Sequence, residues 1–378
     1  MSYIVLLSSG VCFENGIITD EFKDLYQLSL QNEISLAIIS RNSHKTMYTH
    51  KIIEAFGPDN KISIVDRQIC SRGNTLGDDD KNRILIVGAI KEDIWIAANN
   101  QILLVNPLWI DKVDTSILKY GFSISSPKQL VECISILKLD TQIYQRQKLS
   151  DVTEIISITR ARNFRATLEQ NAVINDYREY LKRGADKYRY AVFFHYLSML
   201  FKSNEFRDID YWTGAPSSTG ATNNGIYEIV DYSRYLMKKR EAALIVRHKP
   251  AEKSTEIRSN IRKTLDSSRH FSTMHVNPNF RNSIAGKKIV VLDDYVTNGH
   301  TFEATRLLLE AAGAAKIYLI SIGTYENPYQ LQEVNFNGDI FNPNYKFEII
   351  NKKDLHFFYN NEALDIIDEI YEIIYNRI

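Results

Sequence analysis

The hydrophobic residues of the first 110 positions form short apolar runs that alternate with segments of helical spacing. Residues 20–31 repeat apolar positions every three or four residues, and Ser43 is placed to cap a second helix that runs through Ala55. The apolar runs predict strands at residues 3–7, 34–39, 61–65, 84–87 and 102–105. This alternation predicts a parallel sheet with helices on both faces, closed by a last helix after Ser126 and Pro127.

The second half of the chain repeats this alternation after a polar stretch. Residues 141–184 are charged and mostly helical in spacing, so we expect a helical connector there. Strands are predicted at residues 208–212, 242–246, 288–292 and 316–322, and helices at residues 191–201, 227–237 and 301–312. The chain is therefore expected to be an α/β protein with two domains, 1–140 and 185–330. Its tail, 331–378, ends in an amphipathic helix at 362–374 that is expected to pack on a domain or on a partner.

The composition is that of a packed protein without a strong charge of either sign. Lys+Arg and Asp+Glu both number 46 in 378 residues, so the formal net charge is zero and gives no global basic excess for nucleic acid or an anionic membrane. Cys12, Cys70 and Cys133 are far apart and form no CxxC pair, which fits a reducing cytoplasm. No apolar stretch approaches the ~18 residues of a membrane span. A signal peptide has Lys or Arg before its apolar region, whereas here no Lys or Arg precedes the first apolar run. We therefore expect a cytoplasmic protein with no membrane partner.

The run KKIVVLDDYVTNGHTFEATRLLLEAAGA carries the clearest chemical signal in the chain. Its apolar strand ends in Asp293 and Asp294, at the carboxyl edge where open α/β sheets bind ligands. The loop that then turns into a helix consists of Thr297, Asn298, Gly299, His300 and Thr301. Adjacent carboxylates accept hydrogen bonds from neighbouring ribose hydroxyls, and backbone N–H groups at a helix start favour a phosphate. The pattern predicts a site for a phosphorylated sugar; the alternative is a plain strand-to-helix turn capped by the acids.

This run resembles the signature of type I phosphoribosyltransferases, which bind 5-phosphoribosyl-1-pyrophosphate (PRPP) with a hydrophobic strand, two acids and a T-x-G-x-T loop. The match runs without a gap through residues 290–301, and the resemblance covers about residues 185–325. It implies a Rossmannoid second domain in which the two acids are catalytic and the loop holds the 5′-phosphate. Asn298, His300 and Tyr295 differ from the commoner residues of the family, which leaves the substrate open.

Two upstream segments resemble further parts of that family. The residues DYWTGAPSST end a strand with a hydroxyl-rich loop, 215–220, which resembles the pyrophosphate loop by its position. The segment VRHKPAEKSTEIRSNIRKTL resembles the basic flexible segment of ComF-type and amidophosphoribosyltransferase-like members. The resemblance implies pyrophosphate contacts from Ser217, Ser218, Thr219, Arg247, His248, Lys249 and Lys253. The alternative interpretation of these cations is a solvated loop.

The chemistry of the family requires neither a nucleophile nor a metal cage from the protein. Transfer from PRPP breaks the bond between C1 and the pyrophosphate through an oxocarbenium-like state, which Asp293 and Asp294 are implied to stabilise. Mg²⁺ is expected to arrive with PRPP and to bridge its oxygens, so no separate metal site is predicted. The acceptor, a nucleobase or an amine, is not identified. Tyr325 is a candidate to stack on a base and equally a candidate core residue.

The first domain resembles the Rossmannoid fold of the haloacid dehalogenases (HAD) without the family's catalytic residues. The D-x-D-G motif is replaced by LSSG at 7–10, so that Leu stands for the nucleophile and Ser for the general acid. A later strand ends in Ser40, where the family keeps Ser or Thr, and the acidic motif becomes GAIKED, in which only Asp93 remains. The resemblance implies a HAD-like scaffold without phosphatase activity; an unrelated doubly wound domain is the alternative.

Three functions are compatible with these patterns. The first is a PRPP-dependent transferase with a degenerate HAD-like domain, which the basic segment 247–263 favours. The second is a regulator that binds PRPP or a nucleotide without turnover, which the degenerate first domain and the unidentified acceptor favour. The third, from a resemblance to phosphoribosyltransferase-like domains of retron-associated cassettes, is an effector of bacterial defence or of a toxin cassette. A protein partner or a second copy of the chain is expected to bind the first domain or the terminal helix.

Overall fold

The computed structural model describes residues 2–73, 77–139, 143–185, 189–217, 224–239, 242–251 and 265–375. Its first half contains a six-stranded parallel sheet in the order β5-β4-β1-β6-β7-β8. The strands are β1 (Tyr3–Ser8), β4 (Ile34–Ser40), β5 (Ser63–Asp66), β6 (Ile84–Val87), β7 (Leu103–Pro107) and β8 (Phe122–Ile124). β1, β4 and β6 are buried almost throughout, as apolar strands covered on both faces should be. The predicted α/β architecture with a parallel sheet is confirmed in this half.

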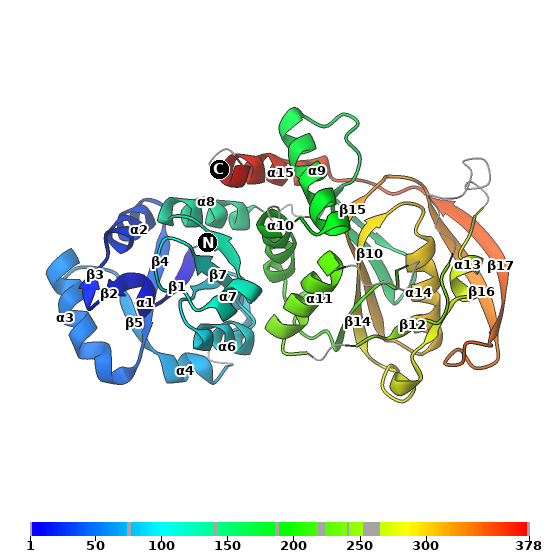
Figure 1. Cartoon of the computed structure of the whole chain (residues 1–378), viewed down its shortest axis with the longest axis horizontal. Coiled ribbons are helices and arrows are strands. Elements are labelled where there is room, and N and C mark those ends of the chain that lie inside the picture. The colour runs from blue at the N-terminus through cyan, green and yellow to red at the C-terminus, as the bar shows by residue number, and fades with distance from the viewer. Residues whose placement is uncertain are drawn as a thin grey trace.

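Helices cover this sheet on two sides (Figure 1). They are α2 (Asp20–Gln31), α3 (Lys45–Phe56), α4 (Arg67–Ser71), α6 (Lys91–Asn100), α7 (Thr115–Tyr120) and α8 (Pro127–Lys138). α2 packs on α8 on one side, and α4 packs on α6 on the other. α8 begins as predicted, because Ser126 Oγ accepts the Gln129 N–H at 3.2 Å. The prediction that Ser43 caps α3 is wrong, since a short 3-10 turn comes first and His44 is the N-cap residue.

A short hairpin follows β1 and was not predicted. After one helical turn, α1 (Ser9–Cys12), the strands β2 (Phe13–Glu14) and β3 (Ile17–Ile18) pair antiparallel. Asn15 and Gly16 form the two-residue turn with φ of 48° and 77°, the positive values that a type I′ turn requires. The hairpin lies beside the carboxyl end of β1, since only one helical turn separates the two.

The second half is built on a five-stranded sheet in the order β11-β14-β15-β10-β9, in which β9 pairs antiparallel with β10. The strands are β9 (Gln145–Lys148), β10 (Thr153–Arg160), β11 (Tyr211–Gly214), β14 (Lys288–Val296) and β15 (Lys316–Thr324). The helical connector predicted at 141–184 is wrong in its first part, because β9 and β10 belong to this sheet. Its second part is helical as predicted, in α9 (Leu168–Arg183). The pattern of apolar residues did not indicate β10, because charged residues lie in it and beside it. Glu154 forms ion pairs with Arg146 at 2.8 Å and with Lys316 at 2.5 Å between neighbouring strands of the sheet.

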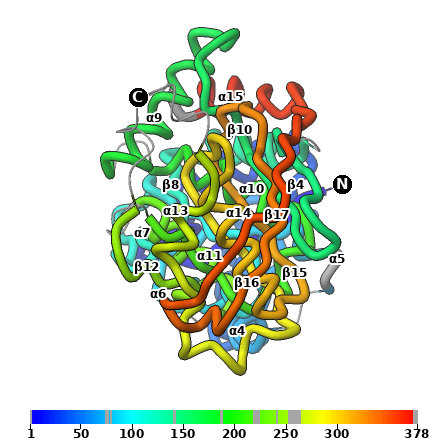
Figure 2. The backbone as a smooth tube through the Cα atoms, turned by 90° about the vertical axis from the view of Figure 1, so that its right-hand side faces the viewer, coloured from blue at the N-terminus to red at the C-terminus, as the bar shows by residue number. Residues whose placement is uncertain are grey.

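The two faces of the second sheet are covered by different elements. One face packs on α9, α10 (Arg189–Lys202), α11 (Asn224–Leu236) and the terminal α15 (Asp365–Ile370). The other packs on α14 (His300–Ala311) and on two hairpins. The hairpins are β12 (Ile245–Arg247) with β13 (Met274–Val276), and β16 (Tyr329–Asn337) with β17 (Lys346–Leu355). Figure 2 shows β16 and β17 along the outside of the molecule. The predicted tail, 331–378, thus contains most of a hairpin before its helix.

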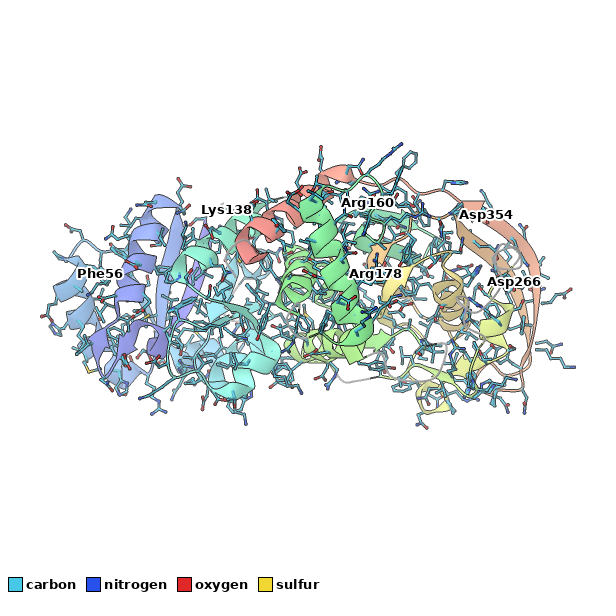
Figure 3. The ribbon with its side chains drawn as sticks, turned by 45° about the horizontal axis from the view of Figure 1, so that its top comes forward. Phe56, Lys138, Arg160, Arg178, Asp266 and Asp354 are labelled. Atoms are coloured by element: carbon cyan, nitrogen blue, oxygen red, sulfur yellow. The ribbon has the colours of Figure 1, made fainter. Side chains whose placement is uncertain are left out.

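A helical layer joins the two sheets. Residues 191–201 of α10 are all buried, and this helix contacts both β8 and β10. Phe122 on β8 packs on Phe194 of α10 with ring centroids 5.0 Å apart, so one hydrophobic core continues from the first sheet to the second. The molecule is elongated, with Phe56 and Asp354 toward opposite ends in Figure 3. Within the ranges given above, none of the helices has both the length and the apolar character that a bilayer crossing requires.

Candidate functional site

The two acids of the motif lie on β14 close to the carboxyl edge of the second sheet. β14 runs between β11 and β15, and its strand continues through Val296 rather than ending at residue 292 as predicted. Asp293 and Asp294 are therefore part of the strand. The N–H of Asp294 donates to Asp293 Oδ1 at 2.9 Å, and Lys182 Nζ of α9 lies 4.0 Å from Asp294 Oδ2.

The environment of Asp293 opposes its ionisation. Burial, and after it the neighbouring Asp294, raises the pKa of the Asp293 carboxyl well above its ordinary value. The ammonium of Lys182 acts in the opposite direction without cancelling this rise. A carboxyl with a strongly raised pKa is typical of sites where a ligand or a reaction changes the charge. A cation or a hydrogen-bond donor that binds beside Asp293 would lower the pKa of this carboxyl again.

The loop after β14 turns into α14 at Gly299. This residue is the N-cap of the helix and has φ 79°, in the left-handed region that glycine tolerates. A Cβ at this position would lie 2.1 Å from Cε2 of Tyr329, whose ring is fully buried. The start of β16 also holds the loop, because Gln330 N–H donates to the Asn298 carbonyl at 3.1 Å and Asn298 Nδ2 donates to the Pro328 carbonyl at 3.2 Å.

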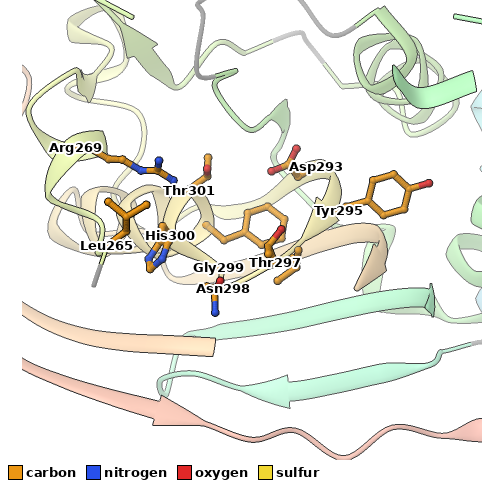
Figure 4. Close-up of a pocket in the computed structure, with 11 residues that line it drawn as sticks. Leu265, Arg269, Asp293, Tyr295, Thr297, Asn298, Gly299, His300 and Thr301 are labelled. Carbon is orange, nitrogen blue, oxygen red and sulfur yellow. The ribbon is translucent and has the colours of Figure 1, made fainter. Parts of the chain in front are cut away.

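A cavity of about 140 Å³ lies between this loop and α13 (Ser268–Phe271), as Figure 4 shows. It is lined by Asp293, Tyr295, residues 296–302, Leu265 and Arg269, so the whole predicted phosphate loop faces it. The guanidinium of Arg269 points toward Thr301 in the first turn of α14. Both a guanidinium and a helix N-terminus carry positive charge, and an anion between them would be attracted by both. The cavity therefore suits a phosphate.

Arg247 on β12 contacts α13, the helix that carries Arg269. Its guanidinium donates to Thr273 Oγ1 at 2.5 Å and to the Pro216 carbonyl at 3.3 Å, and lies 3.2 Å from Nδ1 of His270. Burial, and after it Arg269, lowers the pKa of Arg247 to about 10. The guanidinium stays charged at neutral pH, and these neighbours are neutral or carry the same charge. A second anionic group beside Pro216 would therefore be stabilised here.

His300, the first residue of α14, is neutral in this environment. Burial, and after it Arg269, lowers the pKa of His300 to about 4. Its Nδ1 atom is buried and has no hydrogen-bond partner in the described part of the chain. A neutral imidazole at a helix start can donate one hydrogen bond to an anion without adding charge.

The structure brings together several of the residues that the sequence predicted for the site. Asp293 and the complete loop line one cavity, and Arg247 contacts the Pro216 carbonyl in the segment after β11. That contact holds Pro216, the residue before Ser217 of the expected pyrophosphate loop, beside Arg247. Adjacent parallel strands explain this convergence, since β11 and β14 end at one edge of the sheet.

Other predicted residues are not brought to the cavity. His248 Nδ1 lies 3.3 Å from His275 Nδ1 across the β12–β13 hairpin. Neither His248 nor Lys249 lines the cavity, so the structure does not group them with the loop. Ser218, Thr219 and Lys253 lie outside the described residues.

Two lining residues, Leu265 and Arg269, were missed by the sequence analysis. Both come from the polar stretch between β12 and β13, where no apolar period marks their position. Tyr325, a candidate to stack on a base, packs against the core with its ring 5.8 Å from that of Tyr295. Tyr295 itself lines the cavity, so the two rings connect the site to the core.

The acids can serve a magnesium ion that arrives with a ligand. Carboxylate oxygens are hard ligands of the kind Mg²⁺ prefers, and two of them adjoin at Asp293 and Asp294. Among the described residues, no group of three or more His, Cys, Asp or Glu side chains is placed to hold a metal. The remaining ligands would therefore be ligand oxygens and water.

At the carboxyl edge of the first sheet, the one acid left from the HAD pattern is fully engaged. Asp93 on α6 is buried, and its Oδ2 accepts the N–H groups of Ala89 at 2.8 Å and Ile90 at 3.0 Å. Its Oδ1 pairs with Arg67, which also donates to Ser8 Oγ at 3.1 Å. Both carboxylate oxygens thus already interact with groups of the protein itself.

Comparison with known proteins assigns no family to the chain. No family model and no curated protein matches it. A structure of the GsuK RCK domain is similar at 10% identity and a TM-score of 0.20, covering 84% of this chain and 73% of that chain. UMP synthase of Leishmania donovani is similar at 9% identity and a TM-score of 0.17, covering 84% and 86%. TM-scores this low carry no argument, so function rests on the geometry of the site.

Proposed function

We propose that the second half of the protein binds PRPP and transfers its phosphoribosyl group to an acceptor, a nucleobase or an amine. The observation that supports this is the convergence of Asp293, the loop from Thr297 to Thr301 and Arg269 on one cavity. PRPP combines ribose hydroxyls, a 5′-phosphate and a pyrophosphate. These groups call for carboxylates, a helix N-terminus and cations.

Each residue has a role in this proposal. Asp293 and Asp294 accept hydrogen bonds from ribose hydroxyls and stabilise the positive charge that develops at C1 as the pyrophosphate leaves. The N–H groups at the start of α14, with Arg269, hold the 5′-phosphate. Arg247 holds the pyrophosphate beside Pro216, and Mg²⁺, when bound with PRPP, neutralises charge on that leaving group.

The test is calorimetry with PRPP and Mg²⁺ on the full chain. The double variant Asp293→Asn with Asp294→Asn should lose PRPP affinity by about a hundredfold or more, because charge-assisted hydrogen bonds are each worth about 1.5–3 kcal/mol. Asp339→Asn is the matched control, since Asp339 is exposed, pairs with Arg281 and does not line the cavity. Undiminished affinity in a double variant with native circular dichroism would refute the assignment.

A regulator that binds PRPP or a nucleotide without turnover is the second candidate. Two features of the first half favour this candidate. Asp93, the acid that remains of the HAD motif, forms an ion pair with Arg67, and the hydrophobic core of the first sheet continues into the second sheet. An acceptor screen for pyrophosphate release separates the two. PRPP binding without release for any nucleobase or amine would support the regulator.

We also propose that the first half of the protein has no phosphatase activity. Leu7 is fully buried and has no nucleophilic atom, and both oxygens of Asp93 are engaged. The full chain should therefore release no phosphate from p-nitrophenyl phosphate with Mg²⁺. Turnover that survives further purification and falls in Asp93→Asn would show that the motif alignment is wrong.

A further inference from the structure

A second cavity, of about 340 Å³, lies at the carboxyl edge of the first sheet. It is bounded by residues that follow β1, β6 and β7 and by the β2–β3 hairpin. The sheet order β4-β1-β6 reverses direction at β1, so the cavity lies at the topological switch point, where open α/β sheets bind ligands. Its volume is within the range of small-molecule sites, about 300–1,000 Å³.

The walls of this cavity are fixed in place. Trp109, which follows β7, is partly buried and packs against the hydrophobic core of the first sheet. Phe13 of the hairpin stacks on Tyr48 of α3 with centroids 4.3 Å apart, and Lys51 of α3 donates to the Gly16 carbonyl in the hairpin turn. The aromatic walls are therefore preformed, which reduces the entropy lost when a ligand binds.

Beside this cavity, the backbone N–H groups before α6 that could attract a phosphate already have an acceptor. The first N–H groups before α6, those of Ala89 and Ile90, donate to the carboxylate of Asp93. The guanidinium of Arg67 pairs with the same carboxylate. A phosphorylated ligand would have to displace Asp93 from the interior, so the usual anion site at a helix start is closed here.

The side chains that line the cavity favour the opposite charge. Its lining includes three acidic residues, Glu14, Glu21 and Asp111, and one basic residue, Lys112. Trp109 offers an aromatic face, the best partner for a cation among the aromatic side chains. Apolar walls combined with a carboxylate excess suit a compact apolar group that carries one positive charge.

We propose that this cavity is a binding site for a small organic cation, an amine attached to an aromatic or apolar body. The cation contacts the Trp109 face while Glu14 and Asp111 compensate its charge. This site is separate from the cavity beside Asp293 and takes a ligand of opposite charge to PRPP, so it goes beyond the proposed function. Failure of either assignment leaves the other intact.

Tryptophan labelling tests the proposal in the full chain. The sequence contains three Trp residues, so a protein labelled with 5-fluorotryptophan gives three ¹⁹F NMR signals, from Trp95, Trp109 and Trp212. The Trp109 signal is assigned by its absence in Trp109→Phe. Three probes of similar shape are titrated: phenethylammonium, 2-phenylethanol and 3-phenylpropionate. The Trp109 signal should shift saturably with phenethylammonium, with a Kd about fivefold or more below that of the neutral alcohol, and should not shift with the anion.

A matched pair of variants tests the carboxylates. Glu14→Gln with Asp111→Asn should raise the Kd of phenethylammonium to about that of the alcohol. Glu54→Gln removes an exposed acid on α3 outside the cavity and should leave the Kd unchanged. The proposal is overturned if no probe moves the Trp109 signal, if all three bind equally, or if the double variant keeps the cation preference.

Discussion

Gly299 is required by two independent features of its surroundings, a left-handed backbone and the ring of Tyr329. Gly299→Ala should destabilise the fold by about 1–2 kcal/mol through backbone strain and by about 1–3 kcal/mol more through overpacking. Gly286 has a similar φ, 75°, but nothing within 4 Å of an added Cβ. Gly286→Ala should therefore show the strain alone. Urea unfolding of both variants measures the difference, and equal losses would mean that the Tyr329 contact is unimportant.

The raised pKa of Asp293 predicts a pH-dependent stability of known sign. A carboxyl whose pKa is raised by folding favours its protonated form in the native state, so its contribution is lost as pH rises from the ordinary Asp value through the raised one. Asp293→Asn keeps the acceptor for the Asp294 N–H and removes the ionisation. The variant should therefore gain stability relative to the native protein as pH rises through that window, measured by urea unfolding between pH 4 and 8.

Asp339 provides a control of opposite sign. Its hydrogen bond and charge interaction with Arg281 lower the pKa of the Asp339 carboxyl below its ordinary value. The stabilisation is present above the ordinary Asp pKa and is lost as pH falls through the lowered one. Asp339→Asn should thus lose stability relative to the native protein only as pH rises toward the ordinary Asp pKa, and should show no trend between pH 4 and 8. An equal trend for both variants between pH 4 and 8 would mean that the Asp293 carboxyl is not the source of the change.

At the scale of elements, α14 is anchored to β16 by a buried ionic network. Glu303 is fully buried and accepts hydrogen bonds from Arg306 at 2.5 Å, Tyr329 Oη at 2.8 Å and Gln332 N–H at 2.6 Å. Arg306→Met leaves a buried carboxylate without its cation and should cost about 3–5 kcal/mol of unfolding free energy. Adding Glu303→Gln should recover part of this loss. The exposed ion pair of Arg281 is the control, and Arg281→Met should change little.

The sequence predicted best those helices and strands whose arrangement of apolar and polar residues depends only on which positions are buried. α2 and β6 have the predicted bounds because each has a continuous apolar face or run. β10 was missed because its charges are paired inside the sheet, which a pattern of apolar residues cannot show. The hairpin turn at Asn15 and Gly16 carried a recognisable signal, an Asn-Gly pair between apolar residues.

The candidate site divides in the same way. Asp293 and the loop through Thr301 are contiguous, so one motif identified them together. Arg269 joins them only through the packing of α13 against α14, a contact between segments that no local pattern relates. Sequence therefore predicted the part of the site on one strand and its loop, and not the residues that face it.

At the scale of the whole molecule, one hydrophobic core extends from the first sheet to one face of the second sheet, while the other face of the second sheet has a core of its own. Phe194 of α10 packs on Phe122 of the first sheet, and α10 also contacts β10 of the second. The chain end strengthens the junction, because Gln129 Nε2 on α8 donates to the Ile373 carbonyl at 3.0 Å. A shared core implies that neither half keeps its packing when the other unfolds.

We therefore predict a single cooperative unfolding transition for the full chain. Trp109 reports on the first half and Trp212 on the second, so the ¹⁹F signals of a 5-fluorotryptophan protein follow both halves in one urea titration. The midpoints should coincide. Phe194→Ala removes a fully buried ring between the halves, which costs about 3–5 kcal/mol, and should lower both midpoints together. Leu168→Ala, at a side chain that is 84% exposed, should leave both unchanged. A core shared through α10 couples the loss of one sheet to the exposure of the other, so the two halves should unfold together. Distinct midpoints in the native protein would show instead that the halves fold independently.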